Sequence, residues 1–241
     1  LTQQERRIVY YLASGKKNEQ IAEELHISIY TVRTHIANIY KKFEVNNKVD
    51  LNFASALRSI LRQDPDIIMI GEIRDRETAA IAVQASITGH LVVSTLHTNN
   101  AVGTLNRMAD MGVERYLIAD SVVGVIAQRL VRKLCSHCKK MRPATSEEKR
   151  VLRMNTQEDV NVYEPCGCDF CSHTGYYGRI GVFEIMEVND EIRDLIAENG
   201  TTEELERAAR NSGMRTLREN GINYVLNGTT SVEEMLKASY E

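Results

Sequence analysis

Two short apolar runs in this chain each end at a side chain that could act on a phosphate. The run 67–70 is followed by Gly71 and Glu72, and the run 91–96 is followed directly by His97. A carboxylate at the end of a strand can hold Mg²⁺ or orient an attacking water, and a polar residue ending a neighbouring strand can sense the γ-phosphate. For either residue alone, the interpretation as an ordinary solvated strand end stays open, because single motif matches are often false.

Two pairs of cysteines have the spacing of a metal site. Cys135 and Cys138 form one C-x-x-C pair, Cys168 and Cys171 form a second, and Cys166 is left over. Four thiolates in two such pairs close a tetrahedral Zn²⁺ site, and in a reducing compartment paired cysteines favour metal over disulfide. We therefore predict a structural zinc ion on these four residues, with free thiols or a redox pair as the alternative.

The elements expected to position Glu72 and His97 form one βαβ unit. Both apolar runs are continuous rather than alternating and too short for helices, which is typical of parallel strands buried on both faces. Between them, residues 77–88 are rich in Ala and β-branched side chains, long enough for a crossover helix, and closed by Gly89. A right-handed crossover would bring both strand ends to the edge of the sheet where α/β proteins bind ligands.

The chain beyond this unit alternates helical and extended patterns. Thr201 with Glu204, and Thr230 with Glu233, have the spacing of helix-capping boxes. The fold class is therefore α/β, preceded by an all-α unit. A strand is expected at about 125–135, and helices at about 101–111, 115–123, 191–198, 203–211, 216–226 and 232–239.

Residues 1–51 form a separate helical unit with a helix-turn-helix pattern. Thr2 with Glu5 predicts a capped first helix, Asn18 caps a second, and Ser28 caps a third that reaches Phe43. The third helix has one apolar stripe, and its opposite face is small and basic, which suits the major groove of DNA. A solvated charged face on a helical adaptor is the alternative. The stripe comprises Val32, Ile36, Ile39 and Phe43.

Composition sets the broad class of the protein. The chain has 241 residues, is 43% apolar and carries a formal charge of −3, which excludes a globally basic nucleic-acid binder but not a local basic face. No apolar run approaches a membrane span and no secretory leader is recognisable, so we expect a cytoplasmic protein. Because residue 1 is Leu rather than Met, we expect an excised or incomplete reading frame.

One resemblance covers most of the chain, from about Phe53 to the carboxyl terminus. The stretches DPDIIMIGEIRD, TGHLVVSTLHTNNA and QRLVRKLC closely resemble the Walker B region, the His box and a downstream strand of the type II secretion and type IV pilus assembly ATPases. By that resemblance Glu72 would be the catalytic glutamate and His97 the His-box residue near the phosphates of ATP and its Mg²⁺. Weaker candidates for the nucleotide site are Arg74, Gln128 and Arg129, and ordinary roles on the sheet surface are the favoured alternative for Gln128 and Arg129.

The resemblance also implies a zinc site and partners. Many of these ATPases carry a tetracysteine insert followed by a strand like TGYYGRIGVFE. The zinc ion that this insert binds is structural. They work as hexamers against an inner-membrane secretion or pilus platform protein, so a homo-oligomer is expected.

The nucleotide-binding loop of these ATPases is absent from the sequence. The pattern G-x-x-x-x-G-K-[ST] occurs nowhere in the 241 residues, and the family's acidic and arginine boxes are also missing. Without that loop no backbone N–H groups cradle the phosphates and no hydroxyl holds Mg²⁺. We therefore expect no independent ATP hydrolysis.

A second resemblance covers about residues 1–51. The stretch LTQQERRIVYYLASGKKNEQIAEELHISIYTVRTHIANIYKKF closely resembles the LuxR-type helix-turn-helix of bacterial response regulators. Double-stranded DNA is the partner that this resemblance implies. Matched residue by residue, the groove-facing positions are Arg33, Thr34 and Ala37. The positions expected to contact the DNA backbone are Lys16, Lys17, Asn18, Thr31, His35, Lys41 and Lys42.

The two resemblances meet between Val45 and Phe53, inside one predicted helix at 47–62. Because the first half of the ATPase sheet is missing, apolar surface is expected to be exposed and to promote self-association. The predicted domains are 1–51 for DNA binding, 52–134 for a partial RecA-like core, 135–186 for the zinc insert with its following strand, and 187–241 for a helical end.

Two functions from different classes fit these patterns. One is a secretion or pilus assembly ATPase relative that is truncated, fused to a DNA-binding domain and not catalytic alone. The other is a LuxR-type transcriptional regulator whose ATPase-derived part serves oligomerisation. The missing phosphate loop argues against the enzyme, and the missing receiver or ligand domain weakens the case for the regulator.

Overall fold

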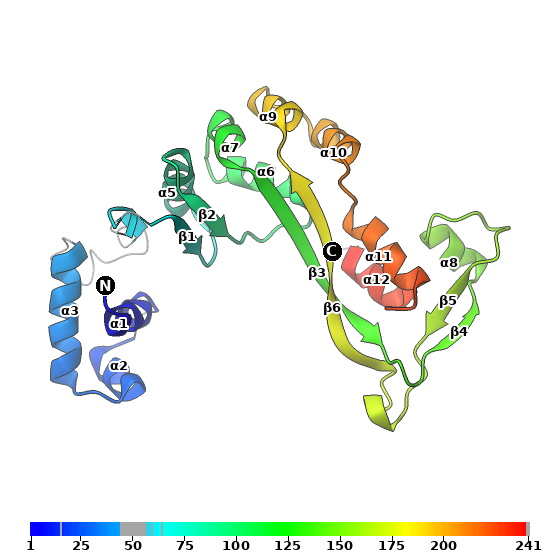
Figure 1. Cartoon of the computed structure of the whole chain (residues 1–241), viewed down its shortest axis with the longest axis horizontal. Coiled ribbons are helices and arrows are strands. Elements are labelled where there is room, and N and C mark those ends of the chain that lie inside the picture. Colours follow the sequence, from blue (N-terminus) through cyan, green and yellow to red (C-terminus); the bar gives the residue numbers. More distant parts are fainter. Residues whose placement is uncertain (15, 44–56, 59, 64, 240–241) are drawn as a thin grey trace. The chain divides into compact units, whose positions relative to one another are not determined.

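The computed structural model describes residues 1–14, 16–43, 57–58, 60–63 and 65–239 (Figure 1). These residues divide into two compact units, Leu1–Leu96 and His97–Glu241. The predicted seam at 45–53 and most of the predicted helix at 47–62 lie outside the described residues. None of the described helices is both long enough and apolar enough to cross a membrane.

The first unit begins with three helices around a small apolar core: α1 (Gln3–Ala13), α2 (Asn18–Leu25) and α3 (Ile29–Phe43). The predicted capping box of Thr2 and Glu5 is present, and the Ser28 hydroxyl accepts the Thr31 N–H at 3.0 Å at the start of α3. The buried core residues include the predicted stripe of α3, apart from Phe43, whose side chain lies outside the described part. They are Ile8, Leu12, Ile21, Leu25, Val32, Ile36 and Ile39.

The start of α2 differs from the prediction. Its N-cap is Lys17, and Asn18 is the first helical residue. The Gln20 side chain accepts the Lys17 N–H at 2.9 Å, which satisfies the N-cap residue itself and not the first-turn N–H groups that Asn18 was expected to accept. The helix ends at His26, whose left-handed backbone (φ 52°, ψ 42°) makes the tight turn into α3.

A βαβ unit occupies the later part of this unit: β1 (Ile67–Ile70), α5 (Arg76–Ile87) and β2 (Leu91–Ser94). The two strands pair in parallel and in register over their full lengths, as predicted. Asp75 caps α5 by accepting the Thr78 N–H at 2.9 Å.

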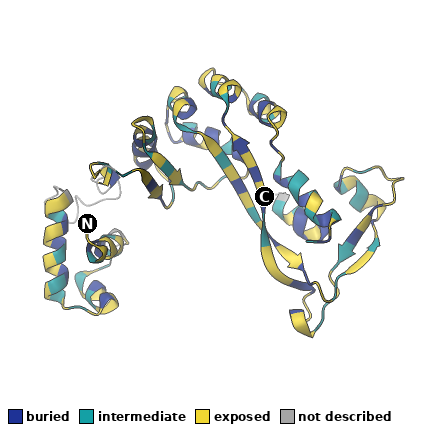
Figure 2. Ribbon diagram, viewed as in Figure 1, coloured by how far each residue is buried: buried dark blue, intermediate teal, exposed yellow. Residues whose placement is uncertain are grey.

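The prediction that these strands are buried on both faces was wrong for the described sheet. Ile68 and Ile70 are buried, whereas Ile67 is 63% and Met69 is 80% exposed. Figure 2 shows both buried and exposed stretches in this sheet. Only two strands form this sheet in the described part of the chain, and α5 packs against it from one side. The apolar side chains of the opposite face therefore remain in contact with solvent.

A long antiparallel ribbon forms the spine of the second unit. In it, β3 (Gly124–Leu134) pairs with β6 (Tyr176–Glu187) along nearly its whole length. The buried face of the ribbon carries Ala127, Val131, Val182 and Met186. The helices that pack against the ribbon are α6 (Ala101–Asp110), α11 (Leu217–Leu226) and α12 (Val232–Ser239) (Figure 1).

A smaller lobe follows the ribbon. It contains β4 (Lys140–Pro143), α8 (Ser146–Val151) and β5 (Asn161–Glu164), and β4 pairs with β5 in antiparallel fashion. Its apolar core is shared with α11 and α12. The other helices of the second unit are α7 (Arg115–Ser121), α9 (Asp190–Ala197) and α10 (Thr202–Asn211).

One of the two predicted capping boxes of the carboxyl-terminal helices is present. Thr201 and Glu204 cap α10 as expected. At α12, the predicted box of Thr230 and Glu233 was wrong, because the buried Thr230 hydroxyl donates to the Arg132 carbonyl at 2.8 Å. The cap is instead Ser231, whose hydroxyl accepts the Glu234 N–H at 3.3 Å.

Candidate functional site

Glu72 follows the carboxyl end of β1, and the neighbouring strand holds that end in place. The Thr95 hydroxyl donates to the Gly71 carbonyl at 2.7 Å, and the Ile73 N–H donates to the Thr95 carbonyl at 3.0 Å. The Glu72 carboxylate, 36% exposed, accepts from Arg74 Nε at 2.6 Å. The structure therefore brings together two of the predicted nucleotide-site residues, Glu72 and Arg74, as an exposed ion pair after the end of β1.

Asp75 was not singled out from the sequence, although an Asp three residues before a Thr is a recognisable helix cap. Its carboxylate accepts both the N–H and the hydroxyl of Thr78, at 2.9 and 3.0 Å. The Thr78 N–H lowers the pKa of Asp75 below its ordinary value. This cap fixes the direction of the chain directly after Arg74, the partner of Glu72, at the point where the loop becomes α5.

His97 is the first residue of the second unit, and its side chain is exposed. The residues that follow are held by a side chain of β3: Arg129 Nη2 donates to the Thr98 carbonyl at 3.2 Å and to Asn99 Oδ1 at 3.3 Å. Asn100 then caps α6 by accepting the Gly103 N–H at 2.7 Å. Of the two candidates on β3, Arg129 thus supports the His97 segment directly, whereas Gln128 points to the exposed face.

Glu184 on β6 is a buried carboxylate that the sequence did not single out. It is 4% exposed and accepts the N–H groups of Ala101 at 2.7 Å and Leu217 at 3.1 Å. These donors are distant in sequence, so only the alternation of apolar residues around Glu184 in β6 could have indicated that it faces the core.

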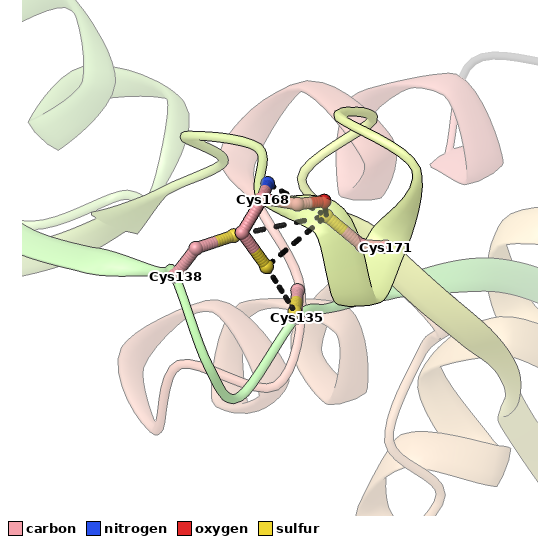
Figure 3. A group of neighbouring side chains, drawn as sticks. All are labelled: Cys135, Cys138, Cys168 and Cys171. Atoms are coloured by element: carbon pink, nitrogen blue, oxygen red, sulfur yellow. Dashed lines mark hydrogen bonds between the residues drawn. The ribbon is translucent and has the colours of Figure 1, made fainter.

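The four cysteines of the two C-x-x-C pairs meet at one end of the β3–β6 ribbon (Figure 3). Their sulfur atoms all lie within 4.8 Å of one another. The distances from Cys168 Sγ to Cys135 Sγ and Cys171 Sγ are 3.9 and 3.8 Å, and that from Cys138 Sγ to Cys171 Sγ is 3.8 Å. Four sulfurs bound to one Zn²⁺ at about 2.3 Å stand about 3.8 Å apart. The sulfur positions therefore fit a tetrahedral ion of this size.

The backbone around the cysteines favours the ionised sulfur that a metal needs. Cys171 Sγ accepts the N–H groups of Cys168 and Gly175, each at 3.2 Å. Burial opposes ionisation of this thiol, but these donors outweigh it and lower the pKa of Cys171 to about 6. Burial raises the pKa of Cys138 to about 12, so an ion that binds all four sulfurs must displace the proton from this thiol. Cys166 is exposed and is not part of the cluster.

One glycine makes the cysteine loop possible. Gly175 has φ +76°, and a Cβ added there would lie 2.4 Å from the Pro165 Cβ. Its carbonyl accepts the Cys135 N–H at 2.9 Å, which ties the second cysteine loop to the end of β3. The loop also carries an exposed ring stack, in which Phe170 lies 4.2 Å from the His137 ring and 4.6 Å from the Tyr177 ring.

The outer face of α3 carries the groove-facing candidates Arg33, Thr34 and Ala37, and all three are exposed. The Thr34 hydroxyl donates to the Tyr30 carbonyl at 3.0 Å, and Tyr30 is 79% exposed beside it. Of the candidates for backbone contact, Lys17 and Lys41 are exposed, and Asn18, Thr31 and His35 are half-buried.

Two of the lysines proposed for DNA contact already have carboxylate partners in this unit. Lys42 Nζ lies 2.8 and 2.9 Å from the oxygens of the buried Glu5. Lys16 Nζ lies 2.5 Å from Glu24 and 4.8 Å from the centre of the Tyr11 ring. These contacts assign both lysines a role in holding the three helices together.

Comparison with known proteins places most of the chain in one family. The model of the type II/IV secretion system protein family matches residues 23–237. This match begins within α2, nearer the amino terminus than the predicted seam. The type II secretion system protein E of Aeromonas hydrophila is 50% identical over 198 residues, which make up 82% of this chain and 39% of that protein. The type IV pilus assembly ATPase PilB of Acinetobacter baylyi is 51% identical over 203 residues, 82% of this chain and 34% of that protein.

A solved structure supports the same relationship. The crystal structure of the pilus retraction motor PilT with bound ADP matches with a TM-score of 0.55 and 29% identity, over 78% of this chain and 44% of that one. This chain therefore spans between about a third and just under half the length of these relatives.

Proposed function

This chain belongs to the type II/IV secretion system protein family, and we propose that it contributes the Walker B and His-box part of an ATP-hydrolysing motor for protein export or pilus assembly. This proposal rests on the position of Glu72, which follows the parallel strand β1 at the edge of the sheet where α/β folds bind ligands. Support comes from the relatives, which include a pilus assembly ATPase and a retraction motor crystallised with ADP.

In the proposed reaction, the residues of this chain act on ATP and its Mg²⁺ from strand ends. Glu72 would orient the attacking water or a Mg²⁺-bound water, with Arg74 holding its carboxylate at 2.6 Å. His97 would contact the γ-phosphate, and Arg129 and Gln128 would be weaker candidates for contact with the nucleotide. The sequence contains no G-x-x-x-x-G-K-[ST] pattern, and the proposal assigns the phosphate-cradling loop to residues outside these 241.

The same proposal includes the assembly, the zinc ion and the domain plan. We assign Zn²⁺ to Cys135, Cys138, Cys168 and Cys171, because their sulfurs all lie within 4.8 Å of one another and three of the distances between them, 3.8–3.9 Å, match a tetrahedral site. The ion would stabilise the loop at the end of the ribbon.

A hexamer that works on the cytoplasmic side against an inner-membrane platform protein is the arrangement that family resemblance favours. The proposed domains are 1–51, 52–134, 135–186 and 187–241.

The test is ATP hydrolysis by a chimera of the Aeromonas hydrophila protein. In this chimera, the 198 residues of this chain that match that protein at 50% identity replace their counterparts. The chimera retains that protein's preceding residues. It is expected to hydrolyse ATP, and Glu72→Gln and His97→Gln are expected to abolish most of this activity. Glu77→Gln, an exposed carboxylate on α5, is the matched control. An active Glu72→Gln chimera would contradict the assignment of Glu72.

The exposed face of α3 favours a second function, binding of double-stranded DNA by residues 1–51. Arg33, Thr34 and Ala37 leave a small, cationic surface of the kind that enters a major groove. In this hypothesis the chain is a LuxR-type regulator, and its ATPase-derived part serves oligomerisation.

Fluorescence anisotropy with a labelled duplex at low salt tests DNA binding by the full chain. Binding should weaken steeply as salt rises, because phosphate contacts release counterions. Arg33→Ala should weaken binding, whereas Arg7→Ala, an exposed arginine on α1, should not. Absence of duplex binding at low salt would remove this function.

A further inference from the structure

One buried carboxylate in the second unit caps two helices at once. Glu184 Oε1 accepts the N–H of Ala101, the first residue of α6, and Glu184 Oε2 accepts the N–H of Leu217, the first residue of α11. The first turn of a helix has unpaired N–H groups and a partial positive charge, so a carboxylate is well suited to both ends. A neutral amide could not replace it, because an amide has only one acceptor oxygen.

Arg129 lies beside Glu184 on the same face of the ribbon. In the register, Glu184 is opposite Ala127 and Arg129 is opposite Val182, so the two side chains are diagonal neighbours. Arg129 donates to the carbonyl of Thr98 and the side chain of Asn99. The ribbon therefore holds the backbone on both sides of Asn100, immediately after His97.

We propose that Arg129 and Glu184 are positioning residues for His97, and that Glu184 couples the His97 segment to α11. This inference rests on the proposed function in that His97 acts at the nucleotide phosphates. Residues 95–98 have no regular secondary structure, so their position depends on contacts from outside the segment. Thr95 is held by Gly71 and Ile73, and beyond His97 the two ribbon side chains provide such contacts, at Thr98, Asn99 and Ala101. A displacement of α11 acts on the carboxylate that also holds Ala101, and through it on the loop that carries His97.

The test uses the full 241-residue chain, with hydrogen exchange of backbone amides and NMR of ¹³C-labelled histidines as readouts. Glu184→Gln is expected to raise the exchange rate of the Ala101 or the Leu217 amide about tenfold or more, because one of them loses its acceptor. Arg129→Ala is expected to shift or broaden the His97 ring resonance, assigned by its loss in His97→Gln. Arg129→Lys, which keeps a donor, should restore part of the signal.

Glu187→Gln is the matched control, since Glu187 is an exposed carboxylate on the same strand. Its exchange rates and His97 resonance should equal those of the unmodified chain. If the backbone amides of the β3–β6 ladder lose their protection from hydrogen exchange in Glu184→Gln, that variant is unfolded. The comparison of Arg129→Ala with Arg129→Lys then decides whether the ribbon positions His97.

The two proposals fail in different ways. Unchanged amide exchange and an unchanged His97 resonance in the folded variants overturn the positioning of His97 by Arg129 and Glu184, which we call the clamp. This holds whether or not the chimera hydrolyses ATP. A changed resonance supports the clamp. If the chimera carrying His97→Gln nevertheless hydrolyses ATP normally, the clamp stands as a structural device and the role of His97 at the phosphates is wrong.

Discussion

The Glu5 carboxylate accepts two hydrogen bonds from the Lys42 ammonium, at 2.8 and 2.9 Å, and joins α1 to the end of α3. Glu5 is 3% exposed and also caps α1 through the Thr2 N–H at 2.6 Å. The pair therefore closes the three-helix unit with charges at positions 37 residues apart.

Lys42→Ala is expected to destabilise the three-helix unit by about 1–3 kcal/mol, because it leaves a buried carboxylate without its cationic partner. The measurement is the urea midpoint from the methyl resonances of the fully buried Ile8 and Ile39. Lys41→Ala, its exposed neighbour, is the control and should change the midpoint little. Equal midpoints for the two variants would contradict the structural role of Lys42.

The stability of this unit should also depend on pH. The hydrogen bond from Lys42 lowers the pKa of Glu5 from its ordinary 4.5 to about 2. Because the folded state binds this proton more weakly than the unfolded state, the stabilisation is complete above about pH 4.5 and is lost as the pH falls towards 2. The Ile8 and Ile39 resonances should report this loss, and the pH dependence should be weaker in Lys42→Ala. An unchanged acid dependence in that variant would contradict the pairing.

Loss of one cysteine should separate the metal site from the odd thiol. Cys138→Ser is expected to reduce the bound Zn²⁺, measured by elemental analysis after purification, from one ion per chain to a small fraction. Cys166→Ser should keep the full amount, since Cys166 lies outside the four-sulfur cluster. Equal zinc contents in the two variants would show that the cluster does not hold the ion.

Gly175→Ala should disturb the cysteine loop more than any polar change near it. A side chain there combines a left-handed backbone with a Cβ placed 2.4 Å from Pro165, so the loop has to move. In a competition with a chelator, we expect a lower affinity for Zn²⁺, with the free energy of binding less favourable by about 1–3 kcal/mol. Gly178→Ala is the comparison, because Gly178 shares a positive φ but has no atom within 4 Å of the added Cβ. Similar effects of both changes would show that backbone strain alone, without the clash, is responsible.

Sequence patterns predicted the features that depend on neighbours within three or four residues. The capping boxes at Thr2 and Thr201 and the two cysteine pairs arise from such short spacings, and the strand–helix–strand order follows from the local pattern of each of its elements. The continuous apolar run of β1 was misread because its pattern reports hydrophobicity, while burial depends on which elements cover the sheet.

Contacts between distant positions could not be predicted from spacing. Glu184 meets donors 83 and 33 positions away, and its charge alone would have favoured an exposed site. The spacing of Thr230 and Glu233 predicts a helix cap, yet tertiary packing turns the Thr230 hydroxyl to the Arg132 carbonyl, 98 positions away. Arg129 was singled out for the nucleotide, and the structure shows it holding the backbone after His97.

Separate measurement of ATP binding and ATP turnover in the chimera tests the proposal that Glu72 is the catalytic glutamate of a secretion or pilus assembly motor. Glu72→Gln should leave the ATP dissociation constant within about twofold of that of the unmodified chimera and lower the turnover rate by about 100-fold, as expected for loss of a general base. A turnover rate equal to that of the Glu77→Gln control would contradict it.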